Sequence, residues 1–432
     1  MASLRPLRWR PKRSRALRAQ REPPPRGRNL VGTVGSAGST AAECGHAGGP
    51  LFPILHTRIF FLSIAVAVTF LFAYALSPKK QQTRFRSRGW MVNTSNRSFR
   101  RSLLPGTRAT RKKGKTSLDL ARMVLVVNGV LQEEAPADSR SLYSAHPVYR
   151  ETAAQLHSMP AKLVGPVGLL YVLQREMAAT LPHDKNVSIL GSDDMTTCII
   201  VVVRHSGSGA VALAHLDGAG TEDAATAMLQ RVTELALGYP EGRIELQLVG
   251  GYSDPRNYSE ELFYNILSAF HKQPVEIDLT LCCIGELNMT VRGGIRWPVI
   301  YGIGLNVKTG EIFPATFPDK GPDLALRSAR HLTGGQQVLD VYDCTLGLLR
   351  IGPFNYDPLR GIDLWLAQSD QFILQHLSTS PDVEPPHFVS RIRAALKYIQ
   401  DNQFPAVTVF RDNRPHYYRR DEATGVWQPI RY

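Results

Sequence analysis

Cysteine is scarce in this chain, and its spacing matches no metal-binding pattern. The 432 residues contain only Cys44, Cys198, Cys282, Cys283 and Cys344. An odd, small number of cysteines without a C-x-x-C pair excludes a disulfide scaffold and a zinc finger. The chain also lacks a glycine-rich G-x-G-x-x-G phosphate motif. We therefore expect no metal or organic cofactor, and a reducing compartment, the cytoplasm or the nucleus.

Acidic residues are almost missing from the first 122 residues. This part has 25 Lys and Arg against three acidic residues, whereas the remainder has 26 against 34. The formal net charge of +14 is therefore a property of the N-terminal part and does not describe what the remainder binds. Abundant Arg, Pro and Gly predict a disordered extension at 1–122. The basic residues are not interleaved with aromatic ones, which argues against nucleic-acid binding.

A long apolar run, residues 59–76, interrupts the basic extension. A helix of this length would extend about 27 Å, enough to cross the core of a bilayer. Basic residues flank both ends, so the positive-inside rule assigns no orientation. The extension is therefore either a membrane anchor or an upstream segment joined to a start at Met123, and we favour the second interpretation.

From residue 123 to residue 432 the composition predicts a folded domain. The expected strands are 168–172, 187–190, 199–203, 211–217, 244–249, 277–283, 299–307, 338–342 and 346–351. The expected helices are 222–237, 259–270, 323–332, 363–376 and 389–399. These segments show no regular βαβ alternation, so we expect an α+β fold with layered, mostly antiparallel sheets and flanking helices.

A predicted β-hairpin brings a cysteine and a histidine together. Residues 199–203 are a β-branched run, and residues 206–209 are a turn signal. A loop of two residues (206–207) or of four (205–208) pairs Cys198 directly with His215. A four-residue loop at 206–209 instead places Asp217 opposite Cys198 and His215 on the diagonal of the same face. An odd loop would move His215 to the other face.

These residue types suit thiol-based acyl chemistry. The imidazole of His215 can take the proton of Cys198 and pass it to an amine leaving group. Asp217 can orient the imidazole ring, and the backbone N–H groups of Thr197 or Cys198 can bind an oxyanion. Without family information, packing roles for this cysteine and histidine are the commoner outcome.

Other polar residues near these segments have weaker signals. Asp193 and Asp194 precede the cysteine and could either bind a substrate ammonium group or cap a loop. Residues 250–254 are interpreted as a turn in which Ser253 or Asp254 caps the next helix. His387 follows two prolines at the entry to a helix and is interpreted as structural.

Several long motifs carry a resemblance to a known family. They are Val164–Val172, Ser188–Cys198, Leu248–Asp254, Pro298–Ile303, Leu349–Pro353 and Leu377–Phe388. In these motifs, and in their order along the chain, the sequence from 123 to the C-terminus resembles the protein N-terminal asparagine amidohydrolase family. Family members usually begin Met-Pro, where this chain has Met123-Val124 after 122 further residues.

The resemblance implies a thiol-dependent amidase. The enzyme would hydrolyse the side-chain amide of an N-terminal asparagine through a thioester, with Cys198 as nucleophile and His215 as base. The resulting N-terminal aspartate would be arginylated and enter the N-degron route to ubiquitin-dependent degradation. The implied fold is similar to that of Cys-His deamidases, and we expect a monomer. The alternatives are a deamidase of internal Gln or Asn in a protein partner, and an inactive, membrane-anchored binding protein.

Overall fold

The computed structural model describes residues 124–431. The expected extension at 1–122, with its apolar run at 59–76, lies outside these residues. Among the helices of the described part, none has the length and apolar character needed to cross a membrane.

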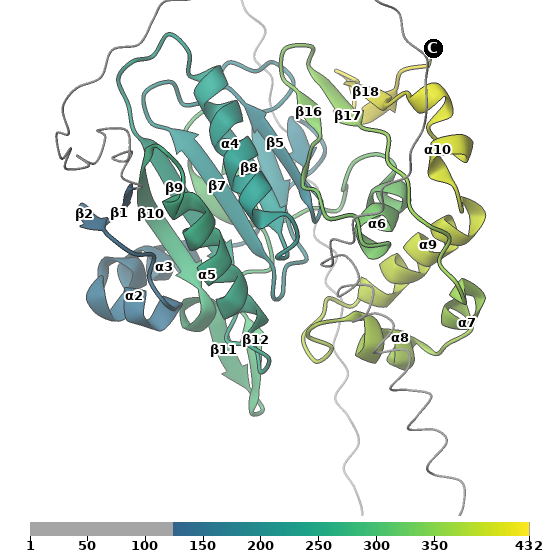
Figure 1. The fold of residues 1–432 in the computed structure, drawn as a ribbon, viewed down its shortest axis with the longest axis horizontal. Helices are drawn as coiled ribbons and strands as arrows, with labels where there is room; N and C mark the ends of the chain where they lie inside the picture. Colours follow the sequence, from purple (N-terminus) through teal and green to yellow (C-terminus); the bar gives the residue numbers. More distant parts are fainter. Residues whose placement is uncertain (1–123, 432) are drawn as a thin grey trace, which may run out of the picture. The chain divides into compact units, whose positions relative to one another are not determined.

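An eight-stranded sheet forms the centre of the fold (Figure 1). We call it the first sheet. Its strands, in spatial order, are β15 (Leu339–Asp340), β5 (Glu176–Thr180), β8 (Val211–Leu216), β7 (Ile199–His205), β9 (Ile244–Gly250), β10 (Glu276–Ile284), β1 (Val124–Val127) and β2 (Val130–Gln132). Helices α4 (Thr221–Leu235) and α5 (Tyr258–His271) cover one face of this sheet.

A second, five-stranded sheet packs against the other face of the first. Its strands are β3 (Lys162–Leu163), β14 (Ile312–Thr316), β13 (Ile303–Asn306), β6 (Ile189–Ser192) and β4 (Leu169–Tyr171). The core between the sheets includes Ile200 and Leu213 of the first sheet and Leu190 and Ile303 of the second. This packing brings the end of β6 next to β8, where the candidate site lies.

The period-two pattern of β7 explains its central place. Ile200 and Val202 face the second sheet, whereas Val201 and Val203 join the core beneath α4 and α5. Because both faces are buried, the first five residues of the strand, 199–203, are all apolar instead of alternating with polar residues. Helix α4 contributes a complementary stripe at helical spacing, which includes Ala225, Met228 and Val232.

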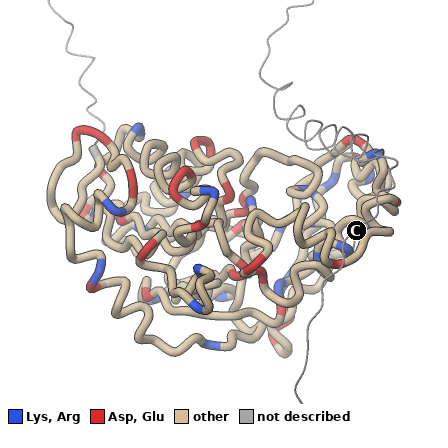
Figure 2. Tube along the Cα trace, turned by 90° about the horizontal axis from the view of Figure 1, so that it is seen from below, with Lys and Arg blue, Asp and Glu red and all other residues tan. Residues whose placement is uncertain are grey.

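The remaining elements surround these two sheets (Figure 1). The helices are α2 (Ser139–Ala145), α3 (Val148–Ser158), α6 (Leu324–Leu332), α7 (Ile362–Leu366), α8 (Asp370–Leu377), α9 (Phe388–Asp401) and α10 (Pro405–Thr408), with 3₁₀ turns η1 (Gly285–Asn288) and η2 (Arg411–Asn413). A four-stranded sheet contains β16 (Tyr342–Asp343), β17 (Leu348–Ile351), β18 (His416–Arg420) and β19 (Trp427–Pro429), and a hairpin contains β11 (Met289–Arg292) and β12 (Ile295–Pro298). Figure 2 shows basic and acidic residues interspersed along the described chain.

The expected α+β class with mostly antiparallel sheets is confirmed, with local differences. In the first sheet, β9, β10 and β1 run parallel to one another. The strand expected at 299–307 is limited to Ile303–Asn306, and the helix expected at 363–376 is divided into α7 and α8. The division occurs because Ser369 caps α8, its Oγ accepting a hydrogen bond of 3.2 Å from the N–H of Phe372.

A buried ion pair connects α6 to the sheets. Arg327 is 1% exposed, and its guanidinium donates to Glu176 of β5, with Nη2 2.6 Å from Oε2. The same Nη2 donates to the carbonyl oxygen of Tyr171 in β4 over 2.9 Å. Since α6 also lines the candidate site, this pair holds one wall of the site in place.

We predict that Glu176→Ala destabilises the protein by about 3–5 kcal/mol, because the substitution leaves a buried guanidinium without its counter-ion. Chemical unfolding followed by circular dichroism measures this change. The control, Glu222→Ala on the exposed start of α4, should alter the free energy of unfolding by no more than about 0.5 kcal/mol. Equal effects of the two substitutions would contradict the structural role of the pair.

Candidate active site

The hairpin turn fixes which residues face one another. The N–H of His205 donates to the carbonyl oxygen of Ala210 over 2.8 Å, which makes these two residues the last pair before a loop at 206–209. Ile200 therefore pairs with His215, and the register, continued by two residues, places Asp217 opposite Cys198. Of the loop lengths considered above, the four-residue loop at 206–209 is confirmed, and direct pairing of Cys198 with His215 is wrong. Cys198 and His215 therefore lie on the same face of the sheet as diagonal neighbours. Diagonal neighbours are typically about 7–8 Å apart, which side chains of this length can bridge.

His215 is buried, and only one of its ring nitrogens is engaged. Its Nδ1 lies 2.7 Å from the Oγ of Ser192 at the end of β6, whereas its buried Nε2 has no hydrogen-bond partner in the part of the chain that the structure describes. Burial lowers the pKa of His215 to about 4, although the charge of Asp217 acts in the opposite direction. The imidazole is therefore neutral at pH 7, and a proton on Nδ1 leaves the lone pair of Nε2 unused.

Cys198 stands at the entry to β7 and lines the same cavity as His215. Burial, and after it the charges of Asp217 and Glu384, raise the pKa of the Cys198 thiol well above its ordinary value. Within residues 124–431 no hydrogen bond joins the sulfur to the imidazole. The resting pair is thus a neutral thiol and a neutral imidazole, not a preformed ion pair.

Asp217 contacts other residues than the imidazole. Its Oδ2 accepts from Arg175 Nε over 2.7 Å and from Gln174 Nε2 over 2.6 Å, and its Oδ1 accepts from the N–H of Ala219 over 3.1 Å. The group that contacts the His215 ring directly is the Ser192 hydroxyl. Asp217 therefore acts on the imidazole through its charge, and the role of orienting the ring by a direct bond falls to Ser192.

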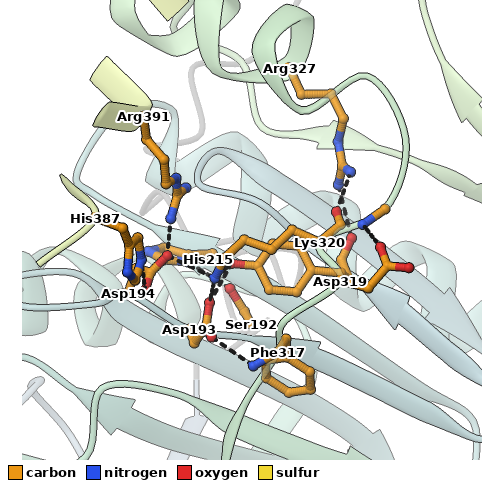
Figure 3. Close-up of polar contacts among 12 residues, drawn as sticks. Ser192, Asp193, Asp194, His215, Phe317, Asp319, Lys320, Arg327, His387 and Arg391 are labelled. Atoms are coloured by element: carbon orange, nitrogen blue, oxygen red, sulfur yellow. Dashed lines mark hydrogen bonds and ion pairs between the residues drawn. The ribbon is translucent and has the colours of Figure 1, made fainter. Parts of the chain in front are cut away.

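Asp193 and Asp194 are held by cations of the protein (Figure 3). Lys320 contacts Oδ1 of Asp193, and the N–H of Phe317 donates to Oδ2 over 2.9 Å. Asp194 is contacted by Arg391, by Lys320 Nζ at 2.8 Å and by His387 Nε2 at 2.9 Å. All four carboxylate oxygens have partners, so these two residues are arranged to fix the loop before Cys198.

A second loop, residues 378–387, closes over the loop before Cys198. Thr197 Oγ1 lies 2.8 Å from Thr379 Oγ1, and Ser380 Oγ lies 2.7 Å from Thr196 Oγ1. These contacts, together with the His387–Asp194 pair, attach the loop between α8 and α9 to the entry of β7. We call residues 378–387 the covering loop.

Two residues next to the site have backbones in the left-handed region. Arg175 has a φ of 60° and Asp194 a φ of 61°. This region is uncommon for residues other than glycine, and it persists where the surroundings dictate it. At both positions the side chain forms a salt bridge that stabilises the conformation, Arg175 with Asp217 and Asp194 with Lys320 and Arg391.

The cavity at this site has a volume of about 230 Å³. Its wall contains Cys198 and His215 together with Glu384, His387 and His331. Burial lowers the pKa of His331 to about 4, and its buried Nδ1 has no hydrogen-bond partner among residues 124–431. No group of three His, Cys, Asp or Glu side chains in the described residues is arranged to hold a metal ion. The arrangement suits nucleophilic attack on a small carbonyl group followed by proton transfer.

Sequence reasoning missed part of this site. The expected place of His387 at the entry to a helix is confirmed, since it precedes α9 and pairs with Asp194. Its position in the cavity wall was not expected. Ser192 and Glu384 lie inside the motifs Ser188–Cys198 and Leu377–Phe388, but no local spacing marks either one as a site residue. His331 gave no sequence signal beyond its place in a predicted helix.

Comparison with known proteins identifies the family of this chain. The model of the family described as protein N-terminal asparagine amidohydrolase matches residues 159–429. Relatives of that name from Sus scrofa and Homo sapiens are each 44% identical over 308 residues, which cover 71% of this chain and 98% of each relative. A relative of the same name from Arabidopsis thaliana is 28% identical over 256 residues, 53% of this chain and 72% of the relative. The chain therefore belongs to the protein N-terminal asparagine amidohydrolase family, a family of amide hydrolases.

The burial of His215 makes the stability of the fold dependent on pH. In the unfolded chain the imidazole takes up a proton near pH 6.5, but in the folded state only near pH 4. Acidification from pH 7 to pH 5 therefore favours the unfolded state, and we expect His215 to contribute about 2 kcal/mol to this loss. Urea unfolding at both pH values should show a smaller loss for His215→Gln than for the wild type. Identical losses would mean that His215 is protonated as readily in the folded state as in the unfolded chain.

Proposed function

We propose that the protein hydrolyses the side-chain amide of an N-terminal asparagine to aspartate and releases ammonia. One observation supports the chemistry most directly: a neutral, buried imidazole, fixed through Nδ1 by Ser192, has an unpartnered Nε2 and lines a cavity together with a cysteine thiol. The proposed substrate class rests on the family, whose model matches residues 159–429 and whose named members match 71% of this chain.

The first half-reaction forms a thioester. His215 Nε2 accepts the thiol proton as the Cys198 sulfur attacks the side-chain carbonyl carbon of asparagine. Backbone N–H groups of Thr197 or Cys198, at the entry to β7, are the proposed donors to the oxyanion. The imidazolium then returns its proton to the amide nitrogen, the C–N bond breaks and ammonia leaves.

The second half-reaction regenerates the thiol. Neutral His215 takes a proton from water, and the resulting hydroxide attacks the thioester carbonyl carbon. The C–S bond breaks, the sulfur takes back the proton, and aspartate remains at the N-terminus of the substrate. Ser192 Oγ accepts a hydrogen bond from Nδ1–H in both steps and keeps Nε2 directed at the reacting atoms.

The proposed biological role follows from the product. An N-terminal aspartate is a substrate for arginylation, and we propose that this chain feeds the N-degron route to ubiquitin-dependent degradation in the cytoplasm. The substrates would be proteins and peptides that expose asparagine at their N-terminus. Glutamine carries its amide one methylene further out, and a cavity of about 230 Å³ would disfavour it by roughly 1–3 kcal/mol.

The central prediction concerns the nucleophile. The full chain should release ammonia from a peptide with a free N-terminal asparagine, and Cys198→Ala should lower kcat/KM at least about 1,000-fold because no thioester can form. A coupled ammonia assay and the mass of the product peptide measure both quantities. Cys344→Ala, at a half-buried cysteine away from the cavity, is the matched control and should retain the wild-type rate.

The same assay separates the alternative functions. An acetylated asparagine peptide should be a poor substrate, because acetylation removes the charge of the N-terminal amine. Equal rates with free and acetylated peptides would favour a deamidase of internal Gln or Asn. If neither peptide releases ammonia, an inactive binding protein is favoured.

A further prediction concerns the orientation of the imidazole. Ser192→Ala removes the partner of Nδ1 and should lower kcat by roughly 10- to 100-fold while KM changes little, since general acid–base catalysis depends on a correctly placed ring. Steady-state kinetics on the asparagine peptide measure the two parameters. A wild-type kcat for Ser192→Ala, combined with an inactive Asp217→Asn, would transfer the orienting role to Asp217.

A further inference from the structure

An enzyme that acts only on N-terminal residues needs a group that recognises the α-ammonium. A buried positive charge is stable only beside a negative charge that is not already neutralised. Among the described residues, four carboxylates line the cavity or act on the Cys198 thiol: Asp193, Asp194, Asp217 and Glu384. Asp193 forms a salt bridge with Lys320, and Asp194 forms salt bridges with Lys320 and Arg391. Asp217 forms a salt bridge with Arg175.

Glu384 differs from the other three carboxylates. No Lys, Arg or His of the described residues lies within 4.0 Å of its carboxylate, and its partners are hydroxyl groups. Ser378 Oγ donates to Oε1 over 2.5 Å, and Ser380 Oγ lies 3.1 Å from the same oxygen. Burial raises the pKa of Glu384, whereas these hydroxyls and that of Thr196 act against the rise. The site thus contains a carboxylate that is held in place but lacks a counter-ion.

We propose that Glu384 binds the α-ammonium group of the substrate and that Asp193 and Asp194 do not. This inference rests on the proposed function, because it names the group that gives the same site its preference for N-terminal residues.

The position of Glu384 meets the geometric requirement. Only three bonds separate the α-nitrogen of asparagine from its side-chain carbonyl carbon, so the ammonium anchor and the nucleophile must share one small cavity. Glu384 and Cys198 line the same cavity of about 230 Å³, and the covering loop that carries Glu384 is hydrogen-bonded to the residues just before Cys198. Tyr301 also donates to the carbonyl oxygen of Val383 over 3.1 Å, which fixes the backbone next to Glu384.

Binding of the ammonium would also help to activate the nucleophile. The negative charge of Glu384 is one cause of the raised pKa of the Cys198 thiol. An ammonium group beside Glu384 cancels this charge, so the thiol loses its proton more easily once a correct substrate is bound. An acetylated peptide brings no positive charge and therefore gains neither the binding contact nor this assistance.

The decisive test uses a substrate that lacks only the amine. A peptide capped with a succinamoyl group has the same side-chain amide as an asparagine peptide but no α-ammonium. For the full chain, Glu384→Gln should lower kcat/KM on the asparagine peptide by about 10- to 100-fold, the range expected for a lost charge-assisted hydrogen bond. The same substitution should change kcat/KM on the succinamoyl peptide by less than about threefold.

Two further variants separate recognition from structural support. Asp194→Asn releases Lys320 and Arg391 and should lower the rates on both peptides by the same factor. Glu384→Asp retains the charge and should keep part of the preference for the asparagine peptide. The proposal is overturned if Glu384→Gln lowers kcat/KM on both peptides by the same factor. The variant would then prefer the asparagine peptide over the succinamoyl peptide as strongly as the wild type does.

Failure of the proposed function gives a different result from failure of this inference. If the wild type releases no ammonia from the asparagine peptide, the enzymatic function fails. Glu384 is then tested by calorimetry of the same peptide with Cys198→Ala, where additional Glu384→Gln should weaken binding by about 10-fold or more. Unchanged affinity in this comparison would overturn the role of Glu384 by itself.

Discussion

A hydrogen bond between the two sheets is the constraint on which the site depends. Ser192 ends a strand of the second sheet, His215 lies in the first sheet, and 2.7 Å separates Ser192 Oγ from His215 Nδ1. The bond can form only when the two sheets are held in a fixed position relative to each other. The apolar core between the sheets, which includes Ile200 and Leu190, holds them in that position. It fixes the His215 ring so that Nε2 has no partner among residues 124–431. In the proposed mechanism this nitrogen is the general base, already in place before the substrate arrives.

Electrostatics around this ring favour a resting site without separated charges. Burial disfavours both the thiolate of Cys198 and the imidazolium of His215, and Asp217 adds negative charge near both groups. The two carboxylates before Cys198 are neutralised by Lys320 and Arg391. Of the carboxylates in the cavity wall, Glu384 has no Lys, Arg or His of the described residues beside it. In this account, the substrate supplies the missing positive charge and the site becomes reactive only when an N-terminal residue occupies it.

Patterns over a few consecutive residues predicted the strands and turns whose formation depends on local geometry. The β-branched run of β7 and the turn after it predicted the hairpin that the structure contains. Likewise, Cys282 and Cys283, neighbours in β10, lie in different cores, as the period of two in a strand requires. Strand β5 was not predicted, because Glu-Met-Ala-Ala-Thr has little intrinsic strand preference and pairs with β8 through tertiary contacts. Ser192 and Glu384 escaped notice for a related reason: each reaches the site by packing of layers and loops distant in sequence, which no local spacing records.

The central claim is that Cys198 carries the acyl group of the substrate. Rapid quenching of the full chain with an asparagine peptide, followed by intact mass spectrometry and peptide mapping, tests it most directly. The account predicts an early adduct on Cys198 with the mass of the peptide minus ammonia, which decays as the aspartate product appears. Formation of product at the wild-type rate after Cys198 has been blocked by alkylation, or an adduct confined to another residue, would contradict the account.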